Sequence, residues 1–338
     1  MIQIIRSCDN SFSLNSVSGP LLYRLTNDYL FRALLQENNE VLKGLICSLL
    51  HVSPEQIHSA SIENSIELGN SISEKTFFLD VKVLMNNSTI INLEMQILNI
   101  GNWPERSLSY LCRSFDQLYK GQDYAETKPV IHIGILDFTL FPEHPEFYAT
   151  YKLMNVKNHT IYSDKFQLSV LDLKHTDLAT AQDKRYQINL WAGLFKATTW
   201  EEIKMFAEKN EFISGAAKTL YQLSADEKIR RQCEEREEYY RVQRTIAREK
   251  QQALDELAHI RSELVNTQSE LTNTQSALTN TQSKLTNTQS ALTNTQSELT
   301  NTQSALTNTQ SELTDARQKI ASLQSQIEAL RGRPQQQA

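Results

Sequence analysis

Apolar and polar residues alternate along residues 77–96, FFLDVKVLMNNSTIINLEMQ, and this is the strongest pattern in the chain. Odd-numbered positions from Phe77 to Met95 are mostly apolar, whereas the even-numbered positions include Asp80, Glu94 and Gln96. The alternation runs on both sides of an Asn-Asn-Ser break. Because side chains alternate faces along a strand, it predicts the two strands of a β-hairpin.

The length of the turn determines whether the two acids face each other. The apolar rows of two antiparallel strands must lie on the same side of the sheet, which requires a loop with an odd number of residues. A three-residue loop of Asn86, Asn87 and Ser88 meets this condition and places Asp80 directly opposite Glu94. Two facing carboxylates repel each other unless a cation lies between them, and a divalent metal ion is the usual cation.

The segments around the hairpin predict an α/β domain over residues 21–222, after an irregular segment at 1–20. Helices are predicted in TNDYLFRALL, with Thr26, Asn27 or Asp28 as its cap, and over residues 39–51. Extended segments are predicted at 57–66, 129–138, 147–155 and 166–173. Residues 182–222 are predicted to be helical, with a capping box of Thr199 and Glu202.

Residues 102–121 predict an amphipathic helix that follows the hairpin. Asn102 suits its N-cap, Pro104 its first turn and Gly121 the position just past its end. The polar stripe consists of Arg106, Tyr110, Arg113 and Gln117, and the apolar stripe of Leu108, Leu111, Phe115 and Leu118. We expect the polar stripe to cover the face of the hairpin that carries the acids.

The last third of the chain has a different composition. Mixed charges at helical spacing predict an exposed helical linker over 223–256. Residues 257–330 contain seven copies of NTQSxL with a period of seven, so that one heptad position always holds leucine or isoleucine. Threonine occupies the second seam position in the repeats, and the pattern predicts a coiled coil with a polar middle, which would make the protein a homo-oligomer. The alternative is a disordered polar spacer, because Asn, Thr and Ser are poor helix formers. A disordered tail is expected at 331–338.

Composition excludes several classes of protein. The net charge of −6 is not that of a strongly basic nucleic-acid binder, although an enzyme that meets DNA briefly is compatible with it. No apolar run reaches membrane-spanning length, and we expect a cytoplasmic protein without a membrane anchor. His132 lies in an apolar strand and is interpreted as a packed core residue. The four cysteines are scattered without metal-site spacing, which argues against zinc and against a disulfide framework: Cys8, Cys47, Cys112 and Cys233.

Taken together, these segments resemble the PD-(D/E)XK nuclease fold. More narrowly, they resemble the bacterial recombination-promoting nuclease (Rpn-like) or transposase family. The segments that carry the resemblance are TNDYLF, FLDVKV, INLEMQ, PERSLSYLCRSFDQLYKGQDY, KPVIHIGILDF and LWAGLFKATTWEEI. It covers roughly residues 20–220 and leaves the repeats outside. It implies a restriction-endonuclease-like α/β/α core with a mixed sheet, here followed by a helical region and the coiled coil.

The resemblance also implies a metal-dependent DNA endonuclease. Asp80 and Glu94, with the backbone carbonyl of Met95, would hold Mg²⁺ or another divalent cation, and Gln96 would complete the catalytic set. The wider fold usually has lysine at the last motif position. Gln96, as in the narrower family, can orient a water molecule but cannot supply a positive charge.

Several further residues are candidates for a supporting role. Lys82 shares the face of Asp80 and could supply the missing charge, although an exposed or ion-paired lysine is the simpler interpretation. Arg106 and Tyr110 could contact the scissile phosphate or hold the carboxylates. Glu40 is the candidate for an acidic residue contributed by the preceding helix, and Asp28 is interpreted as a helix cap rather than a ligand.

Two other functions remain open from the sequence. The domain could be a catalytically degenerate nuclease fold that acts as an oligomeric DNA-binding or scaffold protein, which the acidic charge and Gln96 favour. It could also be a module that binds DNA ends without a metal. Cleavage of a plasmid with and without a chelator separates both from the nuclease.

Overall fold

A computed structural model describes residues 14–64, 80–116 and 118–331. The chain divides into two compact units, Met1–Lys250 and Gln251–Ala338. Part of the predicted hairpin strand, including Phe77 and Leu79, lies outside the described residues, as does Gln117. Most of the segment predicted to be irregular, and the tail from residue 332, lie outside them as well.

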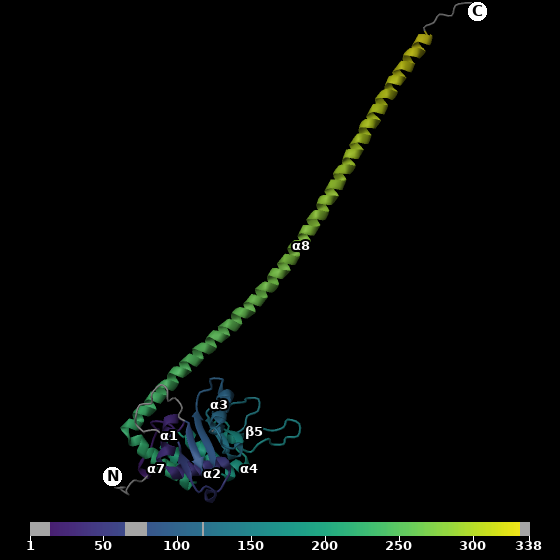
Figure 1. Ribbon diagram of the computed structural model, residues 1–338. Coiled ribbons are helices and arrows are strands. Elements are labelled where there is room, and N and C mark those ends of the chain that lie inside the picture. Colours follow the sequence, from purple (N-terminus) through teal and green to yellow (C-terminus); the bar gives the residue numbers. More distant parts are fainter. Residues whose placement is uncertain (1–13, 65–79, 117, 332–338) are drawn as a thin grey trace, which may run out of the picture. The chain divides into compact units, whose positions relative to one another are not determined.

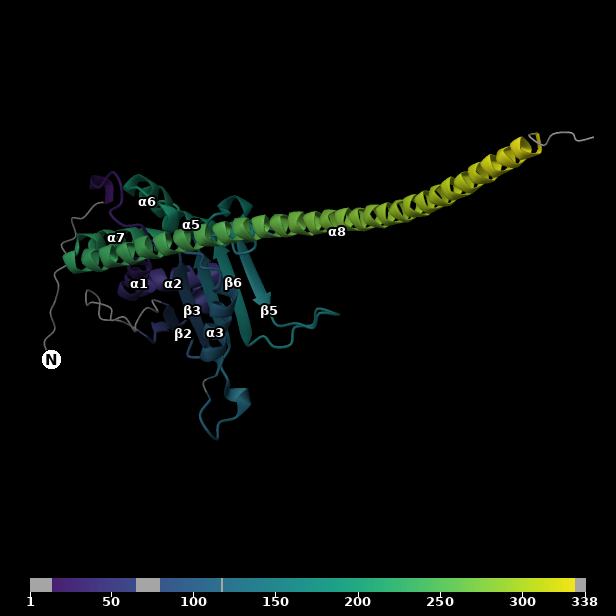
Figure 2. The same ribbon diagram turned by 90° about the horizontal axis from the view of Figure 1, so that it is seen from above.

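Within the described residues, the first unit is built on a mixed sheet of six strands in the order β1-β2-β3-β4-β6-β5. Figure 2 shows β2 and β3 towards one side of this sheet and β6 and β5 towards the other. β3, β4 and β6 run parallel, and the other neighbours are antiparallel. The strands are β1 (Ala60–Ile62), β2 (Val81–Met85), β3 (Thr89–Gln96), β4 (Val130–Leu136), β5 (Tyr148–Lys152) and β6 (Phe166–Asp172). The predicted α/β class and mixed sheet are therefore confirmed.

Helices cover both faces of the sheet (Figure 1). The main core lies between one face and the helices α1, α2, α5 and α7, where Val81, Val83, Leu93 and Ile133 are fully buried. α3 covers the other face, with Leu111 packed against Ile90 and Val130. The α-helices of the first unit up to residue 225 are α1 (Asp28–Glu37), α2 (Asn39–Leu50), α3 (Trp103–Phe115), α4 (Ala181–Arg185), α5 (Ile188–Lys196), α6 (Trp200–Ala207) and α7 (Glu211–Ala225). Short 3-10 helices span Leu14–Ser16, Pro54–Gln56, Tyr124–Glu126 and Thr176–Leu178.

The caps of the helices follow the sequence closely. Asn27 is the N-cap of α1, and its side chain accepts a hydrogen bond from the backbone of Leu30. Asp28 is thus the first residue of the helix and not its cap. Thr199 and Glu202 form the predicted capping box at the start of α6.

Three features of α3 differ from the prediction. The helix ends at Phe115, with Asp116 as C-cap, so Gly121 is not its terminator. Asn102 precedes the helix, but its side chain makes no capping hydrogen bond. The buried stripe is also rotated: Trp103, Ser107 and Leu111 are buried, whereas Leu108 is half exposed. The polar stripe faces the sheet as predicted, because the strands under α3 carry polar side chains such as Glu94, which Arg106 meets.

The charged segment after residue 226 forms the start of α8 (Glu227–Arg331), and one of its faces is buried. Ile229, Cys233 and Tyr240 are at most 4% exposed. Asn27 of α1 donates a hydrogen bond to the carbonyl oxygen of Cys233 at 3.0 Å. The expectation of an exposed linker helix is therefore wrong for this face. The apolar residues among the charges recur every four to seven positions and pack against the first unit.

From Gln251 onwards the described part of α8 is helical as far as Arg331, and its residues are exposed as far as Ala329. Its seam leucines are more than half exposed, for example Leu271 at 62%. A continuous helix favours the coiled coil over the disordered spacer, but pairing with a second helix stays a prediction. Among the described residues, no helix is both long and apolar enough to cross a membrane.

Candidate active site

The β2–β3 hairpin has the predicted register. Val81 pairs with Leu93 and Met85 with Thr89, so Asn86, Asn87 and Ser88 form a three-residue loop. Asn86 and Asn87 both have positive φ angles, which asparagine tolerates better than most residues. Continuing the register by one step places Asp80, which directly precedes β2, opposite Glu94 on β3.

Glu94 lies at the centre of the site and is 4% exposed. Its Oε1 accepts hydrogen bonds from Arg106 Nε at 2.8 Å and pairs with Arg106 Nη2 at 2.6 Å. Its Oε2 is buried and has no hydrogen-bond partner among the described residues, with His132 Nε2 3.7 Å away. Burial raises the pKa of Glu94 to about 7, although Arg106 opposes this rise.

α3 brings its polar side chains onto this face of the sheet. The Arg106 guanidinium lies 5.4 Å from the centre of the Tyr110 ring, one turn further along the helix. Tyr110 in turn stacks on His132 of β4, with the ring centres 6.0 Å apart and the rings almost parallel. Burial raises the pKa of Tyr110 to about 12 and lowers that of His132 to about 4, so both are neutral near pH 7. His132 is fully buried, as expected, but it packs beside the carboxylate.

Hydrogen bonds to its backbone carbonyl oxygen hold Asp80 in position. Arg32 of α1, only 1% exposed, donates hydrogen bonds to the carbonyl oxygens of Asp80 and Asn64. The Asn64 amide also donates to the Asp80 carbonyl oxygen at 3.0 Å, and its own oxygen accepts from the backbone of Lys82. Burial raises the pKa of the Asp80 side chain, and Arg32 opposes the rise. α1 therefore supports the edge of the hairpin on which Asp80 lies.

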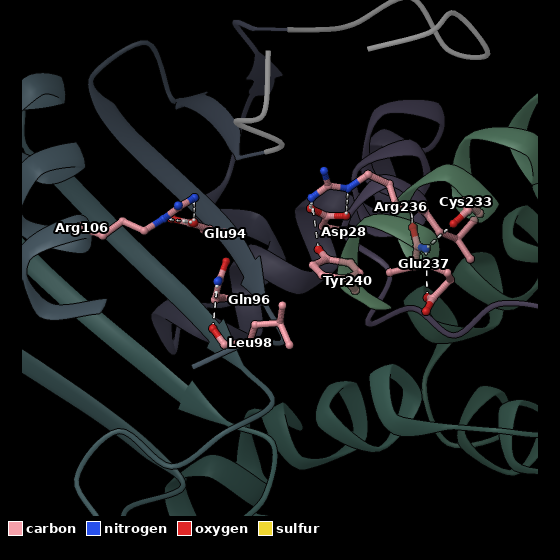
Figure 3. A network of polar contacts seen from close by, with 11 residues as sticks. Asp28, Glu94, Gln96, Leu98, Arg106, Cys233, Arg236, Glu237 and Tyr240 are labelled. Atoms are coloured by element: carbon pink, nitrogen blue, oxygen red, sulfur yellow. Dashed lines mark hydrogen bonds and ion pairs between the residues drawn. The ribbon is translucent and has the colours of Figure 1, made fainter. Parts of the chain in front are cut away.

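A second buried ion pair joins α1 to α8 (Figure 3). Arg236 of α8 donates from Nε to Asp28 Oδ1 at 2.9 Å and from Nη2 to Asp28 Oδ2. The Arg236 guanidinium lies 4.7 Å from the ring centre of Tyr239 and 5.1 Å from that of Tyr240. These two parallel hydrogen bonds hold both side chains in one orientation, because one edge of the guanidinium matches the two oxygens of the carboxylate.

These two ion pairs border one small cavity. Its volume is about 90 Å³, which is room for several water molecules. Its charged lining consists of Asp28, Asp80, Glu94, Arg106 and Arg236. The remaining lining residues are Met95, Gln96, Leu98, Ile100, Tyr239, Tyr240 and Gln243. The strands, α1, α3 and the start of α8 all contribute.

The structure brings some of the sequence-predicted residues together here and separates others. Asp80, Glu94, Gln96 and Arg106 line the cavity, and the Gln96 amide donates to the Leu98 carbonyl oxygen at 3.0 Å. Tyr110 is not among the residues that line the cavity, but it contacts Arg106, which does, and His132. Lys82 does not line the cavity. It pairs with Glu63 at 3.0 Å and is therefore the ion-paired lysine that was the simpler of the two interpretations.

Glu40 is not the acid that the preceding helices contribute to this cavity. It is exposed in the first turn of α2 and does not line the cavity, whereas Asp28 of α1 does. Asp28 could have been found from the sequence, because it is the only acid within the helix TNDYLFRALL. Arg236 could not, because it lies in a run of charges that resembles a solvated helix.

The donor set fits a hard divalent cation held mainly by two carboxylates. Among the described residues, no three His, Cys, Asp or Glu side chains are grouped as a metal site. However, Asp80 and Glu94 line the same cavity, and Glu94 Oε2 is a buried oxygen with no hydrogen bond to any described residue. Mg²⁺ commonly binds through one or two carboxylates and retains several waters, which is compatible with this arrangement.

A comparison with protein families assigns the fold. The family model described as PD-(D/E)XK nuclease family transposase matches residues 25–250. The chain belongs to this family. The match begins just before α1 and ends beyond Gln243, so it includes every residue of the cavity and leaves the repeats outside. It also extends about 30 residues further than the resemblance seen in the sequence, over the part of α8 that carries Arg236. No curated protein and no solved structure matches the chain.

Proposed function

We propose that this member of the PD-(D/E)XK nuclease transposase family is a DNA endonuclease that uses a divalent metal ion such as Mg²⁺. The observation that carries the proposal is that Asp80 and Glu94 line the same cavity, close enough for the charge of Asp80 to act on Glu94, together with two guanidinium groups. Two neighbouring carboxylates suit a metal ion, and the arginines beside them suit a phosphate.

In this proposal each side chain has a separate role. Asp80 and Glu94 hold the metal ion, and Glu94 Oε2 is available because Arg106 occupies only Oε1. When bound, the metal ion lowers the pKa of a water molecule and stabilises charge on the phosphate. Gln96 orients water through its amide but cannot ionise it, so the chain must supply positive charge elsewhere.

Arg106 and Tyr110 act mainly on Glu94 and its surroundings. Arg106 uses two of its nitrogens on Glu94 Oε1 and so keeps the carboxylate in one orientation. Tyr110 lies against both Arg106 and His132, which limits the movement of α3 over the sheet. These contacts support a positioning role for both side chains.

Cleavage of supercoiled plasmid by the full-length protein tests the proposal. We expect cleavage with Mg²⁺ or Mn²⁺ and none with a chelator. Asp80→Asn and Glu94→Gln should abolish it, while the exposed carboxylate variant Glu105→Gln should cleave like the wild type. Cleavage that continues in both Asp80→Asn and Glu94→Gln would exclude this site.

One observation favours the alternative of a degenerate nuclease fold that binds DNA or acts as a scaffold. Two of the three cavity carboxylates, Asp28 and Glu94, are already neutralised by arginines, and Gln96 stands where a lysine is usual in this fold. If DNA binds in chelator but no metal ion supports cleavage, the alternative is the correct function.

We also propose that the heptad segment of α8 pairs with the same segment of a second copy. A single helix rich in Asn, Thr and Ser is marginal in water, and leucines more than half exposed recur at every seventh position. A second identical helix would bury these leucines in one continuous seam. The resulting oligomer would bring two nuclease units together.

A further inference from the structure

The cavity contains a guanidinium group that the roles above leave unused. Arg236 lines the cavity from α8, and its side chain is 10% exposed. Its Nε and Nη2 bind the carboxylate of Asp28, and Nη2 also donates to the Tyr240 hydroxyl at 3.4 Å. Its third nitrogen, Nη1, has no hydrogen-bond partner within the described part of the chain. Figure 3 shows Nη1 pointing away from Asp28.

The other cationic side chains near the carboxylates are committed to partners. Arg106 binds Glu94 through Nε and Nη2, and Lys82 pairs with Glu63. Arg32 is almost fully buried and donates to backbone carbonyls. Gln96 carries no charge. Arg236 therefore combines a positive charge with a donor, Nη1, that points away from its carboxylate partner.

The surroundings of Arg236 hold it in one position. Asp28 fixes one edge of the guanidinium, and the rings of Tyr239 and Tyr240 lie 4.7 and 5.1 Å from it. Burial would lower the pKa of Arg236, but its hydrogen bonds with Asp28 and the charge of Asp28 outweigh burial and raise it. The group is thus a rigid, permanently charged donor at the wall of the cavity.

We propose that Arg236 binds a phosphate of the DNA backbone through Nη1 and so supplies the cationic contact that Gln96 cannot provide. The proposal rests on DNA being the ligand, as in the proposed function. A guanidinium suits this role because it presents donors in a fixed plane that matches phosphate oxygens. In this arrangement α8 is part of the site and not a linker, since its Arg236 completes the cavity opposite the hairpin.

The salt dependence of DNA binding tests the contact independently of cleavage. The full-length protein and a short duplex would be titrated in chelator, by fluorescence anisotropy, from about 50 to about 200 mM KCl. Each phosphate contact contributes about 0.9 to the slope of log K against log salt concentration. Arg236→Gln should lower the slope by about that amount, and Arg236→Lys, which retains the charge, should restore it. Arg231→Gln is the matched control, because Arg231 is 79% exposed on the same helix.

A second pair of variants separates phosphate binding from folding. Arg236→Gln leaves Asp28 buried without its cation, so Asp28→Asn would be compared with the double variant Asp28→Asn/Arg236→Gln. Both of these variants lack the Asp28 carboxylate, so neither contains a buried carboxylate without its cation. The double variant should have the lower slope by about 0.9. Equal slopes, or tighter binding without Arg236, would overturn the proposal, since either result means that Arg236 only joins the helices or shields the cavity.

The outcome for Arg236 can be distinguished from the outcome for the proposed function. A lower slope without cleavage by the wild type in any metal ion retains the phosphate contact and rejects the nuclease. Normal cleavage with unchanged slopes rejects Arg236 alone. No DNA binding by the wild type rejects both.

Discussion

Arg106 and Glu94 form a buried ion pair between α3 and β3, with Arg106 Nη2 2.6 Å from Glu94 Oε1. Replacing Arg106 by Gln would leave Glu94 in a buried site without its cation. Breaking one side of such a pair costs about 3–5 kcal/mol of unfolding free energy when the remaining group stays charged. We expect Arg106→Gln to lose about that amount at pH 8 and less at pH 5, where Glu94 becomes protonated.

Urea unfolding in chelator at both pH values measures this difference. The double variant Arg106→Gln/Glu94→Gln contains neither charge and should recover part of the lost stability at pH 8. An equal loss for Arg106→Gln at both pH values would mean that the guanidinium stabilises the protein by packing alone.

Glu94 itself should make stability fall as pH rises. Burial raises its pKa from the ordinary 4.5 to about 7, so the folded protein binds the proton more tightly than the unfolded protein does. The stability that the protonated form contributes is fully present below pH 4.5 and is lost as pH rises through about 7. Relative to Glu94→Gln, the wild type should lose about 3 kcal/mol across this window. His132, whose pKa is lowered by burial, acts in the opposite direction but is present in both proteins.

Unfolding curves of the wild type and Glu94→Gln, measured in chelator so that no metal ion competes with the proton, test this prediction. A constant stability difference from pH 4.5 to pH 8 would contradict it.

Gly134 should not tolerate a side chain, because Trp103 of α3 lies against it. A Cβ atom at Gly134 would lie 2.1 Å from Trp103 Cζ2, and Trp103 is itself 3% exposed. We expect Gly134→Ala to cost about 1–3 kcal/mol of unfolding free energy by forcing the ring and α3 away from the sheet. Gly215→Ala in α7 is the control, since its Cβ would meet Val41 at an ordinary 3.5 Å. Thermal unfolding should show a lower Tm for the first variant only, and an unchanged Tm would show that α3 shifts freely.

Those features of the site that depend on residues close together in the sequence could be predicted from it. Strand periodicity determined the register of β2 with β3, and hence the position of Asp80 beside Glu94, because the side-chain period of two and the loop length are local properties. Helix caps at Asn27 and Thr199 were predictable for the same reason. The family comparison then supports the wider fold in which the hairpin lies.

The non-local part could not be predicted. Asn92 and Glu94 are polar, and polarity ordinarily indicates exposure, yet both are buried beneath α3. Arg236 lies more than 200 residues from Asp28 in sequence, and its neighbours are charged, so nothing local distinguishes it from a solvated arginine.

The first turns of α8 should be necessary for the first unit to fold, whereas the repeats should determine only the oligomeric state of the protein. A chain that ends at Lys250 retains the Arg236–Asp28 pair and the buried side chains of Ile229, Cys233 and Tyr240. A chain that ends at Gln222 loses all of them and leaves Asp28 without its cation, at a cost of about 3–5 kcal/mol from the broken pair alone. We expect the shorter chain to be unstable or aggregated and the chain ending at Lys250 to unfold cooperatively.

Light scattering then separates the role of the repeats. The full-length chain should be an oligomer and the chain ending at Lys250 a monomer, because only the former has the heptad seam. If both are monomers, the seam stays exposed in solution and the coiled coil is wrong. If both form the same oligomer, the interface lies in the first unit, and the repeats have another role.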